Sequence, residues 1–413
     1  MWISGAADNL IDAAQRPFDP ALPVGVAVSG GGDSMALLHL LSRSNLHLHA
    51  VTVDHGLRDA ARDEAAMVAR FCAAHDIPHD TLHWQGRDAS GNLMDQARRA
   101  RYGLMSDWAR ELGIGQIALA HHGDDVAETF VMRLARRAGV DGLAAMTPDF
   151  VWGDVRFCRP LLGQSRADLH SYLHRQNLPY VDDPTNSDPA HERARVRGAL
   201  ANLADHGLSV DILRNAAQNL AEARTALRFS AHHFARGTVT QQDGDLLIDA
   251  VGFSALPREI RRRIATAAQC WLNGADYARR RAKQDTFLEA IRTGRQTTLA
   301  GCLMLARGET RRITREYAAV QHLKTATDAL WDGRWVLRGP HAHDLHIAPL
   351  GPLGLPRCDT WRDRPLPRAS LLASPAIWRG SALVAAPLAG FGDEWSACLA
   401  KPRDDFAGFL LSH

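Results

Sequence analysis

The sequence predicts an α/β protein in which a parallel doubly wound sheet is followed by a mainly helical domain and a small C-terminal β-rich domain. Three observations predict this fold class. Short apolar runs alternate with helical patterns through the first third of the chain, and after about Ala204 the pattern becomes mostly helical. From Trp331 onward the chain holds nine of its 19 prolines and five of its ten tryptophans. We therefore expect domains over residues 1–204, 205–322 and 331–413.

The first domain is predicted to contain three buried strands at Val24–Ser29, His49–Val53 and Gln116–Ala120. Ligands of parallel sheets bind at the carboxyl ends of the strands, which is where Ser29, Asp54 and His121 stand. The helical patterns around these strands cover Asp33–Arg43, Arg58–His75, Asn92–Leu112 and Asp125–Arg137.

The composition predicts a cytoplasmic protein that does not enter a membrane. The N-terminus lacks the order of a signal peptide, and no apolar run approaches the ~20 residues of a membrane span. Six scattered cysteines without a C-x-x-C pair are expected to be reduced core residues. Residues 1–205 contain 20 arginines, no lysine and 26 acidic residues, whereas residues 206–413 contain 28 basic and 20 acidic residues. We expect the basic half to contact nucleic acid, with solvated helix faces as the alternative.

The stretch Val26 to Leu41, VAVSGGGDSMALLHLL, predicts a phosphate-binding loop. A glycine run after a buried strand lets backbone N–H groups form an anion-binding nest, and the helix that follows adds the positive end of its dipole. A Walker A loop is excluded because it needs a lysine, and Met35 and Ala36 stand where a dinucleotide fingerprint needs glycine. The aspartate in S-G-G-x-D-S would repel phosphates unless a cation such as Mg²⁺ lies between them. A glycine-rich turn with Asp33 as a helix cap is the alternative.

Further motifs give the sequence a specific resemblance. SGGGDS resembles the pyrophosphatase loop of N-type ATP pyrophosphatases, and the motifs downstream occur in the order found in the tRNA(Ile)-lysidine synthetase family. This resemblance covers essentially all of residues 20–200 and implies an adenine nucleotide alpha hydrolase-like fold. The motifs are VDHGLR (Val53–Arg58), NLMDQARRARY (Asn92–Tyr102), LAHHGDDVAETFVMRL (Leu119–Leu134), RPLL (Arg159–Leu162) and YVDDPTNSDPAHERARVR (Tyr180–Arg197).

The resemblance implies an ATP-dependent ligation of free L-lysine to C2 of the wobble cytidine of a tRNA(Ile) with a CAU anticodon. The cytidine oxygen is first adenylated, and AMP and pyrophosphate are released. ATP and Mg²⁺ are the implied cofactors. The implied nucleotide-binding residues are Ser29, Gly30, Gly31, Gly32, Asp33, Ser34, Asp54, His55 and His121, with Asp33 also the candidate Mg²⁺ ligand.

HHGDDVAET supplies the candidate catalytic carboxylates. Asp125 and Glu128 have the spacing of a capping box, and Asp124 with Glu128 is an i, i+4 pair, so three carboxylates share the start of one helix. Simple capping is the alternative, but three carboxylates exceed what a cap requires. In the context of the resemblance we expect Asp125 and Glu128 to hold and deprotonate the lysine, and Asp33 to face the phosphates or the ammonium.

Arginines replace lysine as the cations of this domain. Arg193 and Arg197 lie four residues apart and therefore on one helix face, a spacing suited to phosphate contacts. Arg197 is the candidate catalytic arginine for adenylation. Arg98, Arg99 and Arg101 are further candidates, with surface ion pairs as the alternative.

The chain departs from the family pattern at Val126, Gly123 and Ala194, which stand where glutamine, alanine and asparagine are usual. Three other functions are alternatives on the sequence: a 2-thiocytidine synthetase, a glutamine-fuelled synthetase, or a nucleotide-regulated RNA-binding protein without catalysis. The first needs cysteine pairs, which the sequence lacks. The second needs an amidotransferase partner or a nucleophilic cysteine, and no cysteine here has that setting. The third predicts ATP and tRNA binding without pyrophosphate release.

Overall fold

The computed structural model describes residues 4–54, 56, 61–84, 93–182, 190, 192–274, 281–401, 403 and 405–412. The chain forms two compact units, residues 1–223 and 224–413. Helix α9 begins in the first unit and ends in the second. The expected division into three domains stays a prediction.

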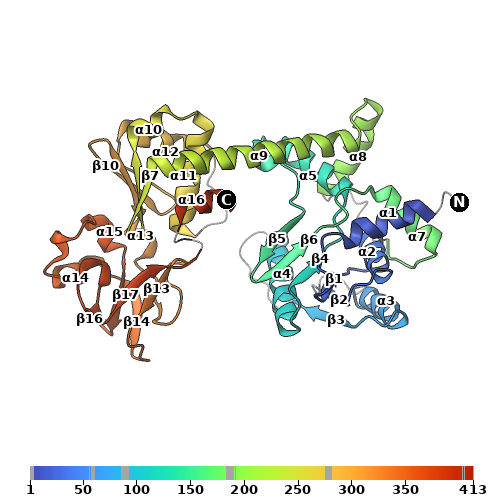
Figure 1. Ribbon diagram of the computed structural model, residues 1–413, viewed down its shortest axis with the longest axis horizontal. Helices are drawn as coiled ribbons and strands as arrows, with labels where there is room; N and C mark the ends of the chain where they lie inside the picture. Colours follow the sequence, from blue (N-terminus) through green and yellow to red (C-terminus); the bar gives the residue numbers. More distant parts are fainter. Residues whose placement is uncertain are drawn as a thin grey trace. The chain divides into compact units, whose positions relative to one another are not determined.

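The first unit contains a six-stranded sheet with the strand order β3-β2-β1-β4-β6-β5 (Figure 1). All neighbouring pairs are parallel except β5 with β6, which form an antiparallel hairpin at one edge. The elements are α1 (Ser4–Gln15), β1 (Val24–Ala27), α2 (Gly32–Ser42), β2 (Leu48–Asp54), α3 (Ala61–Ala74), β3 (His79–His83), α4 (Leu93–Glu111), β4 (Gln116–Ala118), α5 (Gly123–Ala135), α6 (Val140–Leu143), β5 (Asp149–Trp152), β6 (Val155–Cys158), α7 (Arg166–Gln176), α8 (Glu192–Asp205) and α9 (Val210–Thr238).

Two apolar cores cover the two faces of this sheet. On one face, α1, α2, α3 and α7 pack against β1 and its neighbours, with Leu37, Leu38 and Tyr172 fully buried. On the other face, α4 supplies Tyr102, Met105 and Trp108. Helices on both faces of a mostly parallel sheet make the fold doubly wound, which confirms the predicted fold class.

The polar pair His39 and Tyr172 lies within the first core. His39 Nδ1 lies 2.7 Å from the Tyr172 hydroxyl, and the histidine is 8% exposed. Burial, with the nearby charges of His75 and Arg43, lowers the pKa of His39 to about 4 from 6.5. The ring is therefore neutral in the folded protein at neutral pH.

The stability of the first unit is expected to fall in mild acid. Because the folded pKa of His39 lies below the unfolded value, its contribution is complete above pH 6.5 and is lost as the pH falls through about 4. The loss amounts to up to about 3 kcal/mol by linkage. Urea unfolding at several pH values between 7 and 4 checks this: a His39→Leu variant should show a flatter pH dependence, and identical slopes would contradict the assignment.

The second unit combines a helical layer with strands. Its five-stranded sheet has the order β7-β8-β11-β10-β9, and α11 packs on it through the fully buried Ile264, Trp271 and Leu272. The elements up to residue 320 are β7 (Val239–Gln242), β8 (Asp245–Asp249), α10 (Ala250–Ala255), α11 (Arg258–Asn273), α12 (Arg281–Thr293), β9 (Thr297–Leu299), β10 (Cys302–Arg307), β11 (Thr310–Arg315) and α13 (Tyr317–Val320).

The C-terminal part is rich in strands, as predicted. It contains a four-stranded sheet, β12-β14-β15-β16, and the pair β13-β17. The elements are β12 (Thr325–Ala326), β13 (Trp335–Arg338), β14 (Leu345–Pro349), α14 (Gly351–Gly354), η2 (Leu355–Arg357), η3 (Trp361–Asp363), α15 (Arg368–Leu372), β15 (Pro375–Arg379), β16 (Ala382–Ala385), η4 (Pro387–Ala389), β17 (Ser396–Leu399) and α16 (Phe406–Ser412).

Buried ion pairs join these two parts of the second unit. Asp332 accepts two hydrogen bonds of 2.9 Å from Arg315 and lies 3.4 Å from Arg334 Nε. All three side chains are less than a tenth exposed. Arg334 also donates to the Gly244 carbonyl at 2.8 Å. The polar network therefore depends on one carboxylate that compensates two buried guanidinium groups.

An Asp332→Ala variant is expected to lose about 3–5 kcal/mol of unfolding free energy, because it leaves two buried arginines without their carboxylate. Chemical denaturation measures the effect. The matched control is Asp344→Ala, which breaks the exposed Asp344–Arg379 pair and should cost at most about 1 kcal/mol. Equal losses in both variants would show that the buried pair has no special role.

Five of the six cysteines are buried, as expected, but Cys398 is exposed. All six are free thiols. Among the described residues, no helix is long and apolar enough to cross a membrane.

Candidate active site

The SGGGDS segment covers the turn after β1 and the first three residues of α2, at the strand-to-helix junction where the sequence predicted it. Gly30 has a φ of 85°, in the left-handed region that favours glycine. The Ser34 hydroxyl accepts a hydrogen bond from the Ser29 N–H (3.1 Å) and donates to the Gly31 carbonyl (2.9 Å). The first N–H groups of a helix lack intrahelical acceptors and carry the positive end of the dipole, so the loop has the form of an anion site.

Helix α7 and the segment that follows it pack against this loop. The Gly30 carbonyl accepts a 3.0 Å hydrogen bond from the N–H of Val181. A Cβ atom at Gly32 would lie 3.1 Å from His170 Nε2 and 3.3 Å from a ring carbon of Tyr180. Glycine at this position therefore allows the loop and α7 to approach closely.

His122 brings the predicted carboxylates together. It precedes α5, is 1% exposed, and its ring nitrogens lie 3.3 Å from Asp33, 3.5 Å from Asp124 and 3.6 Å from Asp125. Burial lowers the pKa of His122, but the adjacent carboxylates of Asp124, Asp33 and Asp125 raise it overall to about 10. At neutral pH an imidazolium thus connects the phosphate loop with the start of α5.

Helix α5 begins two residues earlier than predicted, at Gly123. His122 is its N-cap, and Asp125 lies in the first turn, where its carboxylate accepts the His122 N–H at 3.1 Å. Asp125 therefore caps the helix from the third helical position and not from the N-cap. The close packing explains Gly123, because a Cβ there would lie 2.9 Å from the Gln164 carbonyl oxygen.

Glu128 and Arg197 form a short ion pair between α5 and α8. Arg197 Nε lies 2.5 Å from Glu128 Oε1, and Glu128 is 1% exposed. The other oxygen, Oε2, is buried and has no hydrogen-bond partner among the described residues. Burial raises the pKa of Glu128, while Arg197 acts against that rise. Apolar contacts that fix α8 on α5 come from Ala127, Leu200, Phe130, Val131 and Val196.

Arg197 lies in the electrostatic field of three of the predicted carboxylates. Burial lowers the pKa of Arg197, but its bond to Glu128 and the charges of Glu128, Asp125 and Asp33 raise it above its ordinary value. The structure therefore brings Asp33, Asp125, Glu128 and Arg197 into one cluster.

His121 lies in a different environment from its neighbour. Burial, with the charges of Arg159, Arg101, Arg98 and Arg193, lowers the pKa of His121 to about 2. The ring is neutral, and the arginines around it form a basic region next to the carboxylate cluster. Arg159 lies over the Phe150 ring, 4.5 Å from its centroid.

Asp54 ends β2 and accepts the Gly56 N–H at 2.8 Å. This bond closes a turn at the end of the strand. His55 lies outside the described residues, as do positions 183–189 and 191 of the motif that precedes α8. Arg195 donates to the Ala190 carbonyl at 2.9 Å.

Sequence reasoning missed Arg166 and His170 on α7. Arg166 Nε and His170 Nε2 lie 3.9 Å and 3.6 Å from Asp33 Oδ1, and the Arg166 N–H donates to Asp124 at 2.8 Å. Burial raises the pKa of Asp33, but His122, Arg166 and His170 together lower it below its ordinary value. The capping pattern Ser165-x-x-Asp168 could have located the start of α7.

Comparison with known proteins defines first the class of domain. Residues 7–204 match the family model described as a PP-loop domain, which implies ATP binding. The chain is 45% identical over its whole length to a tRNA(Ile)-lysidine synthase of Ruegeria pomeroyi, covering 100% of both proteins. It is 38% identical to a protein of the same name from Mesorhizobium japonicum, over 85% of this chain and 81% of that protein. A tRNA(Ile)-lysidine synthase of Zymomonas mobilis is 35% identical over 67% of this chain and 84% of that protein.

The chain belongs to the tRNA(Ile)-lysidine synthase family. The expected family, the ligase class and the ATP-binding PP-loop domain are thereby confirmed.

Proposed function

We propose that this protein ligates lysine to C2 of the wobble cytidine, position 34, of tRNA(Ile) with a CAU anticodon. The cytidine oxygen is adenylated by ATP, pyrophosphate leaves, and the lysine side-chain amine then displaces AMP. The product, lysidine, changes codon reading from AUG to AUA. Membership of the family supports the reaction, and the cluster of Asp33, Asp125, Glu128 and Arg197 supports the assignment of roles.

The observation that carries the proposal is the second oxygen of Glu128. A buried carboxylate oxygen without a hydrogen-bond partner is costly and rare in folded proteins, and a ligand that donates a hydrogen bond would satisfy it. An ammonium group is such a ligand. In our proposal Glu128 Oε2 and Asp125 bind the lysine ammonium and accept its proton, while Arg197 holds Glu128 in place through Oε1.

The nucleotide is assigned to the loop of Ser29, Gly30, Gly31, Gly32, Asp33 and Ser34. Its backbone N–H groups and hydroxyls would bind the phosphates. Asp54, His55 and His121 are assigned to the nucleotide side of the site. The neutral His121 ring can donate or accept a hydrogen bond without adding charge.

The fit to Mg²⁺ depends on Asp33. Its Oδ1 atom is buried without a hydrogen-bond partner among the described residues, and carboxylate oxygens are the ligands that Mg²⁺ prefers. The described residues contain no group of three or more His, Cys, Asp or Glu that could hold a metal by themselves. Asp33 would therefore hold Mg²⁺ together with ATP phosphates, whose charge the ion would neutralise.

The test is transfer of radiolabelled lysine to a CAU-anticodon tRNA(Ile) transcript with Mg-ATP, with pyrophosphate followed in parallel. We expect lysine incorporation in step with pyrophosphate, and none with a tRNA(Met) control. Pyrophosphate without lysine transfer would assign different acceptor chemistry, such as that of a 2-thiocytidine synthetase. Neither product, despite ATP and tRNA binding, would indicate a non-catalytic RNA-binding protein.

A further inference from the structure

Helix α7 places a guanidinium group, with no role in the chemistry proposed above, beside the SGGGDS loop. Arg166 Nε lies 3.9 Å from Asp33 Oδ1 and 3.4 Å from His170 Nε2. The His170 ring in turn lies against the start of α2, because a Cβ atom at Gly32 would be 3.1 Å from His170 Nε2. The Arg166 guanidinium therefore lies next to the first turn of α2, where the loop binds phosphates in our proposal.

The fold holds Arg166 in place but leaves the end of its side chain available. Its backbone N–H donates to Asp124 at 2.8 Å, and its Nε contacts His170. Its two terminal nitrogens, Nη1 and Nη2, make no hydrogen bond to any of the described residues, and the side chain is 30% exposed. A guanidinium stays protonated at neutral pH, and its planar fork of donors matches two oxygens of a phosphate. Arg166 is thus oriented to receive an anion held by the loop.

The other cations near Asp33 are less available to an anion. His122 is 1% exposed, and its ring nitrogens face three carboxylates. Arg197 is bonded to the buried Glu128. Among the described residues, Asp33 is the carboxylate within ion-pair distance of the Arg166 guanidinium, and a separation of 3.9 Å is too long for a hydrogen bond. Arg166 therefore keeps donors that neither His122 nor Arg197 can offer.

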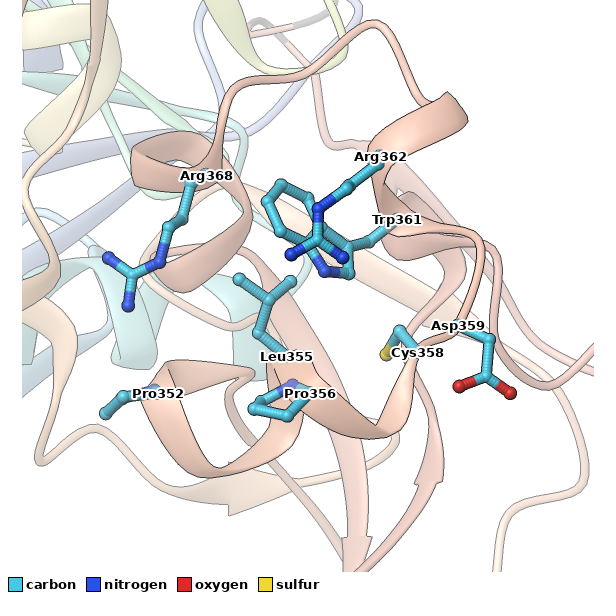
Figure 2. Close-up of a pocket in the computed structure, with 8 residues that line it drawn as sticks. All are labelled: Pro352, Leu355, Pro356, Cys358, Asp359, Trp361, Arg362 and Arg368. Carbon is cyan, nitrogen blue, oxygen red and sulfur yellow. The ribbon is translucent and has the colours of Figure 1, made fainter.

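Arg362 in the second unit is a contrasting case. It has no carboxylate within ion-pair distance in the described part of the chain, and it lines a pocket there (Figure 2). Its guanidinium, however, lies over the Trp361 indole, 4.6 Å from the ring centroid, so a cation–π contact already engages it. Arg166 lies over no Trp, Tyr or Phe ring of the described residues. An anionic ligand is the partner that its charge lacks.

We propose that Arg166 binds the pyrophosphate part of ATP and stabilises its departure during adenylation. This inference rests on the proposed function and adds a catalytic residue to it. A bond forms between the cytidine C2 oxygen and the α-phosphorus, and the bond from the α-phosphorus to the oxygen that bridges to the β-phosphate breaks. The bridging oxygen keeps the electron pair and leaves with the pyrophosphate, while the cytidine ring takes the balancing positive charge. A guanidinium beside the leaving oxygens stabilises the negative charge that develops on them.

Isothermal titration calorimetry with inorganic pyrophosphate and Mg²⁺ tests the contact without tRNA or lysine. Arg166→Gln should weaken pyrophosphate binding about 10- to 100-fold, the effect of losing hydrogen bonds to a charged group. Arg166→Lys keeps the charge but not the fork, so it should weaken binding less. AMP, which contains only the α-phosphate, should bind all variants equally. The matched control is Arg175→Gln, which changes an exposed arginine in the last turn of the same helix and should bind like wild type.

A double-mutant cycle separates a direct contact from an effect through Asp33. If Arg166 only positions the Asp33 carboxylate, Arg166→Gln should have no further effect in protein that carries Asp33→Asn. Direct contact predicts that the loss of pyrophosphate affinity persists in that background, with Mg²⁺ and with EDTA. Unchanged pyrophosphate affinity in Arg166→Gln, or an equal loss of AMP affinity, would overturn the inference, as would a loss that disappears with Asp33→Asn.

The catalytic part of the inference is measured by single-turnover pyrophosphate release at saturating Mg-ATP and tRNA. Arg166→Gln should lower this rate about 10²- to 10³-fold, as the removal of one preorganised donor does. An unchanged rate would contradict the catalytic role of Arg166. Lysine transfer by wild type is scored separately: its absence contradicts the proposed function, whereas weakened pyrophosphate binding by Arg166→Gln still supports the contact.

Discussion

Glu128→Gln is expected to abolish lysine transfer while ATP binding and the fold are retained. The amide can still accept the Arg197 hydrogen bond through its oxygen, but its NH₂ group would then face the lysine ammonium where Oε2 stands in the wild type. The variant thus loses both the acceptor and the base. We expect a loss of about 10²- to 10⁴-fold in the rate of lysine transfer, the range of general acid–base catalysis, and a similar loss for Asp125→Asn.

The helix pair α5 and α8 supplies a matched control for this experiment. Glu192 of α8 forms a 2.5 Å ion pair with Arg136, but both side chains are exposed. Glu192→Gln therefore removes a carboxylate from the same type of pair without touching the cluster, and we expect wild-type turnover. Single-turnover assays with radiolabelled lysine and equilibrium ATP binding should be measured on all three variants. Normal turnover by both Glu128→Gln and Asp125→Asn would rule out the assigned roles.

Arg197→Ala is expected to lower the single-turnover rate of pyrophosphate release by about 10²- to 10³-fold, the range observed when one preorganised donor is removed. The same change removes the cation that counteracts the rise in the pKa of Glu128. If Glu128 acts in its ionised form, the rising limb of the pH profile for lysine transfer should move to higher pH. A merely structural role would lower stability but would leave that limb in place.

Two further variants separate these effects. Arg195→Ala changes a neighbouring arginine of α8 that donates to the Ala190 carbonyl, and we expect it to leave the adenylation rate unchanged. Arg197→Lys keeps a positive charge beside Glu128 but loses the planar guanidinium. Compared with Arg197→Ala, we expect it to recover the wild-type pH profile more fully than the wild-type adenylation rate. An unchanged pyrophosphate rate in Arg197→Ala would contradict its catalytic assignment.

Sequence periodicity predicted the elements that carry the site because those elements are strongly patterned. Apolar runs around Val26 and Ile117 predicted β1 and β4. The glycine loop after the first strand predicted the start of α2. The strand β3 was missed because His79, Asp80 and Thr81 give it a polar edge pattern. The five-stranded sheet of the second unit was missed because it contains short polar strands such as β7, VTQQ. The strongly helical patterns of the surrounding sequence concealed them.

The site was predictable in its residue types but not in its charge balance. The spacing of Asp125 and Glu128 placed both on the first turns of one helix. Nothing in that spacing shows that His122 becomes the shared cation of three carboxylates, because Asp33 comes from a segment nearly 90 residues earlier. The contacts of Arg166 and His170 with Asp33 likewise depend on how α7 packs on α2, which is a tertiary property.

The basic side chains around the carboxylate cluster affect which amines can compete as nucleophiles. Arg166 and Arg197 are guanidinium groups, His122 and His170 are imidazoles, and the first 282 residues contain no lysine. In the proposed reaction, a primary amine tethered to the protein would meet the activated cytidine at an effective concentration in the millimolar range. A guanidinium stays protonated and does not act as a nucleophile at neutral pH. In the proposed reaction, a domain whose cations are arginines and not lysines therefore protects the enzyme against attaching its own side chains to the RNA.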